Sequence, residues 1–201
     1  MEIIWKKKYE LTSQPKLYTI PDFFAMTALV SLLGFIVEDG WMMIRSGFID
    51  NRNMTLPFLL GYGLAVVTMY LLIGTPKKGH FLLYFGLVFF FVSFGEIALG
   101  TTVEKLCGFY YWDYTNLPFH LTRYTSVLTS LGFSAIITSF MYFCYEPLME
   151  FFHERMTPRT RRICITLFVV MLLDMMYSFH MMRQLGDINR AWKITFHAPI
   201  I

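Results

Sequence analysis

The chain has 201 residues, of which 56% are apolar, 18% are aromatic and only 15% are charged, and its net charge is +3. Because globular domains carry about 25% charged residues, this composition excludes an ordinary soluble domain, and it also excludes a disordered chain, a collagen, a coiled coil and a secreted disulfide scaffold. Long uninterrupted apolar runs instead indicate a membrane protein.

The first segment of the chain is basic and lies ahead of any apolar run. Lys6, Lys7 and Lys8 precede a run that begins only near Phe23, and no small-residue cleavage site follows that run. We therefore expect no cleaved signal peptide. The expected organisation is a cytoplasmic or interfacial N-terminal segment over residues 1–22, a transmembrane bundle over residues 23–182 and a C-terminal tail over residues 183–201.

Five apolar runs are long enough, or nearly so, for helices that cross a bilayer, which requires about 20 residues. They are Phe23–Ile44, Pro57–Ile73, Phe81–Leu99, Tyr124–Tyr145 and Ile163–Met182. Strands are a poor alternative, because these runs lack the period-2 alternation of barrel strands. The predicted fold is therefore all-α, a polytopic membrane helical bundle of about five transmembrane helices.

Two connections between these runs are long. Residues 100–123 mix aromatic side chains with polar ones, and because Trp and Tyr favour the membrane boundary, we expect an interfacial or re-entrant loop between the third and fourth spans. Residues 146–162 carry both charges and are typical of a solvated amphipathic connector. The sequence contains no internal repeat and no low-complexity tract, so one membrane domain is the simplest interpretation.

Basic residues in the connections favour an N-terminus on the inner side of the membrane. With that orientation, ten lysines and arginines lie inside and seven lie outside. The expected location is therefore the cell membrane, as a multi-pass protein with a cytoplasmic N-terminus and an outer C-terminus.

Ionisable side chains inside a span cost roughly 2.5–3.5 kcal/mol each on the insertion scale, so each one that is retained needs an explanation. Glu38 lies late in the first span, Glu96 late in the third and Asp174 in the second half of the fifth. Since these three spans run the same way through the bilayer, we predict a polar pocket in one leaflet that binds a substrate or an ion. Its members are Glu38, Glu96, Glu104, Asp113 and Asp174, with Arg52 and Arg123 as ion-pair partners, Asn51 beside them and Trp112 and Tyr114 in an aromatic lid.

A purely structural role for these groups is the competing interpretation. Carboxylate–arginine pairs can lock helices together, and Asp174 can make an interhelical hydrogen bond, with Ser178 one turn further along the same face. Gly61 and Ala65 in the second span have the spacing of a close helix contact. The sequence leaves both interpretations open.

Sequence motifs for common catalytic and cofactor sites are absent. No GxxxxGK[ST] phosphate loop occurs, so any ATPase would be a separate chain. No GxSxG, HExxH or haem-attachment motif occurs, the five histidines are scattered, and the three cysteines form no CxxC pair. We expect no metal, no cofactor and no nucleic-acid partner.

Two stretches resemble a known family of membrane proteins. The residues that carry the resemblance are Glu96, Glu104, Trp112, Asp113, Tyr114, Pro118, Phe119 and Arg123 in the second stretch, Glu38, Asn51, Arg52, Pro57, Tyr62 and Gly63 in the first, and Asp174 with Ser178 in the last span. This pattern is similar to that of the type IV ABC-transporter permease family of CmpB-like membrane proteins, over about residues 28–182. Asn53 replaces the glycine of the family's Asn-Arg-Gly turn, Thr115 replaces a serine and His120 an asparagine.

Three classes of function remain open. The resemblance implies a permease or transport-associated subunit in the lipid bilayer, which forms a homo-oligomer or joins other subunits, with a separate ATPase docked on residues 146–162. The first alternative is an intramembrane enzyme that acts on a lipid or isoprenoid, with Glu38, Glu96 or Asp174 as the proton donor. The second alternative is a non-catalytic membrane sensor or assembly factor. We favour the transport subunit, in which this chain carries out no catalysis.

Overall fold

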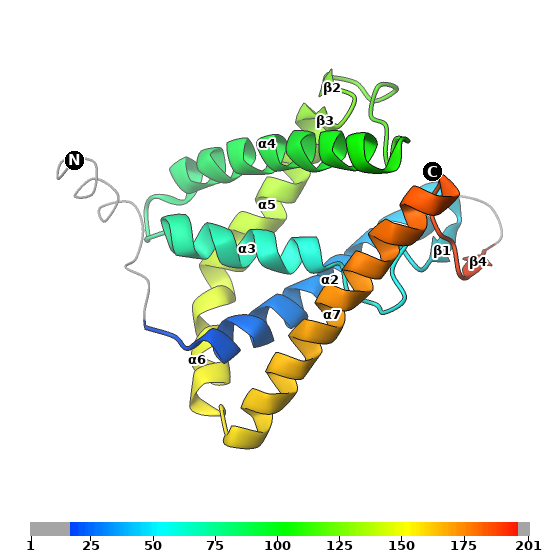
Figure 1. The fold of residues 1–201 in the computed structure, drawn as a ribbon. Coiled ribbons are helices and arrows are strands. Elements are labelled where there is room, and N and C mark those ends of the chain that lie inside the picture. The colour runs from blue at the N-terminus through cyan, green and yellow to red at the C-terminus, as the bar shows by residue number, and fades with distance from the viewer. Residues whose placement is uncertain (1–16, 197–201) are drawn as a thin grey trace. The chain divides into compact units, whose positions relative to one another are not determined.

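The computed structural model describes residues 17–196, which form a mostly helical chain (Figure 1). Predictions that rest on Lys6, Lys7, Lys8, Lys16 and residues 197–201 lie outside the described residues. The helices are α2 (Ile20–Ser46), α3 (Leu60–Ile73), α4 (Phe81–Cys107), α5 (Val127–Phe143), α6 (Tyr145–Glu154) and α7 (Pro158–Leu185). The strands are β1 (Phe48–Asp50), β2 (His120–Thr122), β3 (Thr125–Ser126) and β4 (Lys193–Thr195). The all-α prediction is thus broadly confirmed, with short strands added.

Three helices are long and apolar enough to cross a membrane, namely α2, α4 and α7, with 27, 27 and 28 residues. Helices α5 and α6 give a fourth candidate if the pair, which bends by 49°, counts as one span. Helix α3 has 14 residues, which rise about 21 Å and fall short of a hydrocarbon core of about 30 Å. The described chain therefore has three candidate spans, or up to four, and the expected count of five is not confirmed.

The second expected span begins at Pro57, whereas α3 begins at Leu60. The backbone N–H groups ahead of α3 are used in tertiary hydrogen bonds. The N–H of Leu59 donates to the carbonyl oxygen of Ser31 at 3.1 Å, and two earlier N–H groups donate to Asp174 at 3.0 Å each. These contacts with α2 and α7 hold the segment as a loop, and sequence periodicity does not reveal them.

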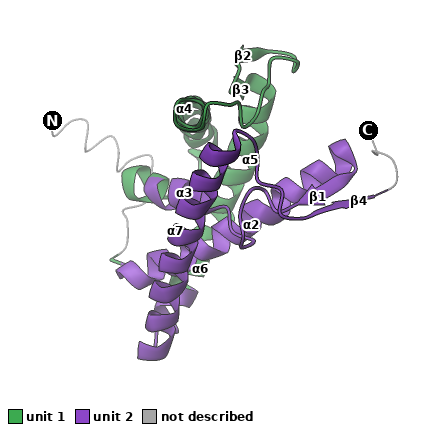
Figure 2. Ribbon diagram, turned by 45° about the vertical axis from the view of Figure 1, so that its right-hand side comes forward, with its two compact units in different colours: residues 1–17, 69–150 green, residues 18–68, 151–201 purple. Residues whose placement is uncertain are grey.

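Two compact units make up the chain (Figure 2). Among the described residues, unit 1 comprises residues 17 and 69–150, and unit 2 comprises residues 18–68 and 151–196. Of the three boundaries, one lies just ahead of α2, one within α3 and one within α6, so α3 and α6 both contribute to both units. The single transmembrane domain expected over residues 23–182 stays a prediction.

In unit 2, α2 and α7 run in the same direction (Figure 1). Phe24 stacks on Phe168 with ring centroids 4.1 Å apart, and one turn further along both helices Ala28 packs with Met171 and Leu60 in a hydrophobic cluster. The contacts advance together along the two helices, as parallel packing requires.

The segment that follows α7, residues 186–196, is here called the C-terminal strap. It places β4 antiparallel to β1, with Ile194 opposite Ile49. The N–H of Phe196 donates to the carbonyl oxygen of Gly47 at 2.7 Å and extends this pairing by one bond. The strap therefore returns along the segment that directly follows α2.

Two glycines allow α2 to approach the first part of α3 closely. A Cβ on Gly63 would lie 2.2 Å from the carbonyl oxygen of Thr27, and a Cβ on Gly34 would lie 2.8 Å from the ring of Tyr62. A Cβ on Gly61 would meet nothing within 4 Å. The close contact thus uses Gly34 and Gly63 rather than the Gly61 spacing noticed in the sequence.

In unit 1, α4 packs along α5, and the connection between them carries the short β2–β3 hairpin. Tyr124, between the two strands, lies against α4, where a Cβ on Gly100 would come within 2.4 Å of its ring. This glycine lets the connection fold back onto the helix and brings its polar groups to the side chains of α4.

Candidate functional site

The first candidate site lies in unit 2, where α2 gives way to β1 and the following loop. Helix α2 ends at Ser46 and is followed by its C-cap residue, Gly47, whose φ is 70°. Beyond β1, the backbone turns at Arg52 and Asn53, with φ values of 45° and 64°. Asparagine tolerates the left-handed region better than most side chains, so Asn53 can replace the glycine of the family's turn. This turn directs Arg52 back towards the end of α2.

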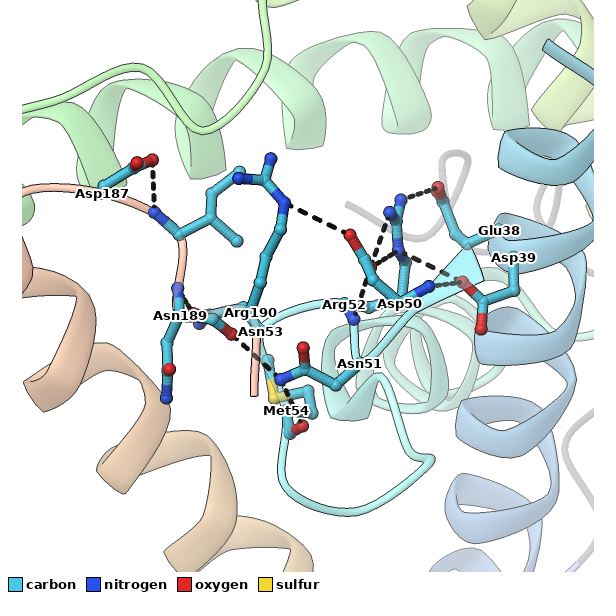
Figure 3. A network of polar contacts seen from close by, with 11 residues as sticks. Glu38, Asp39, Asp50, Asn51, Arg52, Asn53, Met54, Asp187, Asn189 and Arg190 are labelled. Carbon is cyan, nitrogen blue, oxygen red and sulfur yellow. Dashed lines mark hydrogen bonds and ion pairs between the residues drawn. The ribbon is translucent and has the colours of Figure 1, made fainter. Parts of the chain in front are cut away.

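Arg52 is the central cation of this site (Figure 3). Its Nη2 and Nε atoms both lie 2.7 Å from Asp50 Oδ1, its Nε lies 3.4 Å from Asp39 Oδ1, and its Nη1 lies 4.0 Å from Glu38 Oε2. Glu38 also accepts a hydrogen bond from the hydroxyl of Tyr62 on α3. One guanidinium therefore joins two carboxylates of α2 to the carboxylate of Asp50, the last residue of β1.

Asp50 is the most deeply buried member, with 2% of its side chain exposed. Besides the Arg52 side chain, it accepts the backbone N–H of Arg52 at 2.9 Å, and its Oδ2 lies 3.4 Å from Nε of Arg190 on the C-terminal strap. The cluster of Glu38, Asp39, Asp50, Arg52 and Arg190 thus holds three carboxylates and two guanidiniums, or one net negative charge when all are ionised. We call it the Arg52 cluster.

Two asparagines of the same loop hold the backbone of the strap at Asn189. The side-chain amide of Asn51 donates to the carbonyl oxygens of Met54 and Asn189 at 2.9 and 3.0 Å. The N–H of Asn189 donates to the side-chain oxygen of Asn53 at 2.8 Å. The remaining amide atoms, Asn51 Oδ1 and Asn53 Nδ2, are buried and have no hydrogen-bond partner within the part of the chain that the structure describes.

Asp174 of α7 belongs to unit 2, but its partners are not cations. Its two carboxylate oxygens accept the N–H groups of Thr55 and Leu56 at 3.0 Å each, and the residue is 9% exposed. No ion pair joins Asp174 to an arginine among the described residues. The sequence left open an interhelical hydrogen bond for Asp174, whereas the donors in the structure are backbone N–H groups of the loop that precedes α3.

The second candidate site lies in unit 1 along α4. Glu96 accepts hydrogen bonds from the hydroxyls of Thr125 at 2.7 Å and Ser130 at 3.0 Å, and both hydroxyl residues are fully buried. Glu104, two turns further along, accepts a hydrogen bond from the hydroxyl of Tyr124. The carboxylates of Glu96 and Glu104 on α4 therefore accept hydrogen bonds from hydroxyl donors.

The aromatic connection of unit 1 forms the rest of this site. Trp112 donates its indole N–H to the carbonyl oxygen of Tyr124 at 2.9 Å. The guanidinium of Arg123 lies 3.8 Å from the ring centroid of Tyr110, and its Nε lies 3.5 Å from Asp113 Oδ2. Tyr114 joins the same segment through its backbone N–H, which donates to the carbonyl oxygen of Arg123 at 2.8 Å. These contacts order the connection as a compact loop.

Two ionisable groups of this connection have shifted pKa values. Hydrogen bonds from the hydroxyl and the N–H of Thr115, with the nearby Arg123 guanidinium, lower the pKa of the exposed Asp113 carboxyl. Burial, together with the hydrogen bond to Glu104, raises the pKa of Tyr124 to about 12. Asp113 is therefore an anion and Tyr124 a neutral hydrogen-bond donor at physiological pH.

The residues predicted as one pocket fall into two sets, one in each unit. Unit 2 holds Glu38, Asn51, Arg52 and Asp174, and unit 1 holds Glu96, Glu104, Trp112, Asp113, Tyr114 and Arg123. Arg52 and Arg123, expected as ion-pair partners of the acidic residues in general, pair with Glu38 and Asp113, respectively. A common pocket for both sets stays a prediction.

Several members of the two sites were not predicted from the sequence. Asp50 adjoins the Asn51–Arg52 turn, and this adjacency is a signal that could have identified it. Arg190 and the hydroxyls of Thr125 and Ser130 gave no signal, because tertiary contacts alone bring them to their carboxylates. Residues 17–196 contain no group of three or more His, Cys, Asp or Glu side chains arranged to hold a metal ion.

A comparison with protein-family models identifies one match. The model described as "Putative ABC-transporter type IV" matches residues 25–179, which are 155 of the 201 residues (179 − 25 + 1). Every residue that carried the resemblance in the sequence lies in this range, whereas the C-terminal strap lies beyond it. Neither a curated protein nor a solved structure matches the chain.

Proposed function

Because the chain belongs to the family of putative type IV ABC transporters, we propose that it is the membrane subunit of a transporter whose ATPase is a separate chain. The family match over residues 25–179 carries this proposal. Three apolar helices of spanning length agree with a membrane protein, and the sequence has no phosphate-binding loop of the GxxxxGK[ST] type. In this proposal the subunit supplies the path through the membrane, and ATP hydrolysis occurs on its partner.

The connector between α6 and α7 is the proposed docking surface for the ATPase. Its basic side chains are exposed, and they lie just ahead of α7 and in the first residues of that helix. They are Arg155, Arg159, Arg161 and Arg162. Basic residues favour the cytoplasmic side, which is where an ATPase has access to ATP. In the same orientation the Arg52 cluster, at the far end of α2, belongs to the outer side.

The carboxylates of the two sites are proposed to serve the cargo. The Arg52 cluster has one net negative charge, and the Glu96 site has a carboxylate held by two hydroxyls. Charged groups retained among membrane helices commonly mark a substrate or ion path. A cationic cargo is the chemistry that both sites favour.

Co-purification tests the proposed assembly. The tagged chain, extracted in a mild detergent from its own cells, is expected to bring down a polypeptide that contains a phosphate-binding loop, detected by mass spectrometry. Reversing the charge of the connector with Arg161→Glu and Arg162→Glu is expected to reduce this yield at least about tenfold, because a tenfold loss requires only about 1.4 kcal/mol of lost contact energy.

A charge reversal at the other end of α7 provides the matched control. Arg183→Glu makes the same chemical change in the last turn of the helix and is expected to leave the ATPase bound. Recovery of the folded chain as a monomer or a homo-oligomer, with no ATPase even after crosslinking in the membrane, would contradict the proposal.

A further inference from the structure

Arg190 is a guanidinium brought to the Arg52 cluster by the chain's own C-terminal strap (Figure 3). Its side chain is 42% exposed, whereas that of its partner Asp50 is 2% exposed. The contact, Nε to Oδ2 at 3.4 Å, is longer than the 2.7 Å contacts by which Arg52 binds the other oxygen of Asp50. Arg190 therefore approaches Asp50 from solvent and binds its second oxygen loosely.

The strap that carries Arg190 is held mostly by its backbone. The main-chain atoms of Asn189 bond to Asn51 and Asn53, and β4 pairs with β1 along three residues. These bonds do not depend on the side chain at position 190. Replacing that side chain is therefore expected to leave the strap in place and to empty only the position of the guanidinium.

A second acceptor lies next to Asp50 and lacks a donor. The amide oxygen of Asn51 is buried and has no hydrogen-bond partner in the described chain. The whole residue is only 2% exposed. In Figure 3 this oxygen points toward the side of the loop on which Arg190 meets Asp50. A buried acceptor without a donor is unfavourable, so a ligand that donates a hydrogen bond to it removes this cost.

The charges of the cluster favour a cation at this position. With Arg190 removed, Arg52 alone would face Glu38, Asp39 and Asp50, and the net charge of the cluster would change from −1 to −2. A guanidinium suits the position better than an ammonium, because its planar fork of donors can reach a carboxylate and a neighbouring oxygen together and it is more weakly hydrated.

We propose that Asp50 Oδ2 and Asn51 Oδ1 form a binding site for the guanidinium group of a small organic cation, and that Arg190, through its contact with Asp50 Oδ2, is a tethered competitor for this site. The proposal rests on the proposed function only in treating such a cation as the cargo. The strap lies beyond the residues that match the family, so the competitor is a feature of this chain rather than of the matched region.

Binding of methylguanidinium tests the site directly. The purified full chain in detergent is titrated with methylguanidinium chloride, and the apparent affinity is obtained from the rise in melting temperature. A tethered group competes at an effective concentration on the order of millimolar, so Arg190→Gln is expected to tighten the apparent affinity about tenfold relative to the unmodified chain. With methylammonium chloride at the same concentrations, the difference in apparent affinity between Arg190→Gln and the unmodified chain is expected to be much smaller.

Three further variants separate the site from a general effect of charge. Arg183→Gln makes the same change on α7 and should behave as the unmodified chain. Arg190→Lys keeps a tethered cation but replaces the guanidinium with an ammonium, so its apparent affinity for methylguanidinium should lie between those of the unmodified chain and Arg190→Gln. The double variant Asp50→Asn with Arg190→Gln should lose the tighter affinity for methylguanidinium that Arg190→Gln alone is expected to show. Because Asp50→Asn can lower the folded yield, Arg190→Lys provides a test that leaves the carboxylates intact.

Equal methylguanidinium affinities for the unmodified chain and Arg190→Gln would overturn the proposal. So would an equal gain in affinity with methylammonium, or an affinity of Arg190→Lys for methylguanidinium that is higher than that of Arg190→Gln. The measurement needs neither an ATPase nor transport. A failure of binding therefore leaves the proposed transporter assembly standing, and a failure to co-purify an ATPase leaves the binding result standing.

Discussion

Asp174 is a buried carboxylate that bonds to backbone N–H groups instead of to a cation. It occupies the middle of α7, where an unpaired charge would be costly, and its two oxygens accept the N–H groups that precede α3. Ser178, one turn further on, is 1% exposed and its hydroxyl has no partner within the described residues. Asp174 thus bonds to the loop that precedes α3, whereas Ser178, on the same face of α7, shows no hydrogen bond of its hydroxyl within the described residues.

Asp174→Asn is expected to lower the free energy of unfolding by about 1–3 kcal/mol, because an amide offers one acceptor oxygen to two donors and turns its own NH₂ toward an N–H group. Thermal unfolding of the purified chain in detergent measures this loss. Ser178→Ala is the control and is expected to change the stability by less than about 1 kcal/mol, since no hydrogen bond is lost. Equal melting temperatures for Asp174→Asn and the unmodified chain would show that the capping bonds contribute nothing.

At the residue scale, the sequence identifies charged members of both sites but not all of their partners. Glu38, Arg52 and Glu96 could be found because a charge in or beside an apolar run is conspicuous. Arg190 could not, since an arginine after the last helix looks like any solvated residue until the strap folds back along β1. The buried hydroxyl of Ser130 is hidden for a different reason, because serines are common in membrane helices.

At the element scale, the contact of α2 with α3 depends on Gly63, which belongs to the family resemblance but not to the Gly61–Ala65 spacing that suggested a close helix contact. Gly63 lies so close to α2 that a Cβ would come 2.2 Å from the backbone oxygen of Thr27. Backbone cannot move aside as the end of a flexible side chain can. The loop that sets this approach is held by Asp174, so α2, α3 and α7 are positioned by one set of contacts in unit 2.

Gly63→Ala is therefore expected to destabilise the chain by about 1–3 kcal/mol through steric overlap, even though alanine favours helix formation. Gly61→Ala is the matched control, because a Cβ there meets nothing within 4 Å, and it is expected to stabilise α3 by up to about 1 kcal/mol. Unfolding by heat, followed by circular dichroism, compares the two. A loss for both variants, or for neither, would be inconsistent with this packing.

Long apolar helices could be predicted from the sequence, and their interruptions could not. The cores of α2, α4 and α7 follow from long runs of apolar residues. In lipid, the backbone N–H and C=O groups of such runs find no outside partner, so the runs form helices. The late start of α3 depends on hydrogen bonds to residues far away in the chain. The pairing of β4 with β1 involves three residues on each strand. Such strands are too short for the alternation of apolar and polar residues that identifies a strand in a sequence.

At the scale of the whole molecule, the direction of two helices restricts the number of membrane crossings. Helices α2 and α7 run the same way in unit 2, so the chain must return across the bilayer between them. That return needs an odd number of crossings. Helix α4, the candidate span of full length that lies between them in the chain, satisfies this condition alone. We therefore expect an odd number of crossings, as the three candidate spans α2, α4 and α7 provide.

An odd number of crossings places the two termini on opposite faces of the membrane. With the positive-inside bias, a reporter fused to the N-terminus is expected in the cytoplasm and one fused to the C-terminus outside. A third reporter, inserted after Met156 between α6 and α7, is expected on the same face of the membrane as the N-terminus. The reason is that α7 runs parallel to α2 and therefore starts from the same side. Accessibility of each reporter to an impermeant label in intact and in opened cells measures the arrangement. Labelling of both termini from the same face would require an even number of crossings and would contradict the parallel packing of α2 and α7.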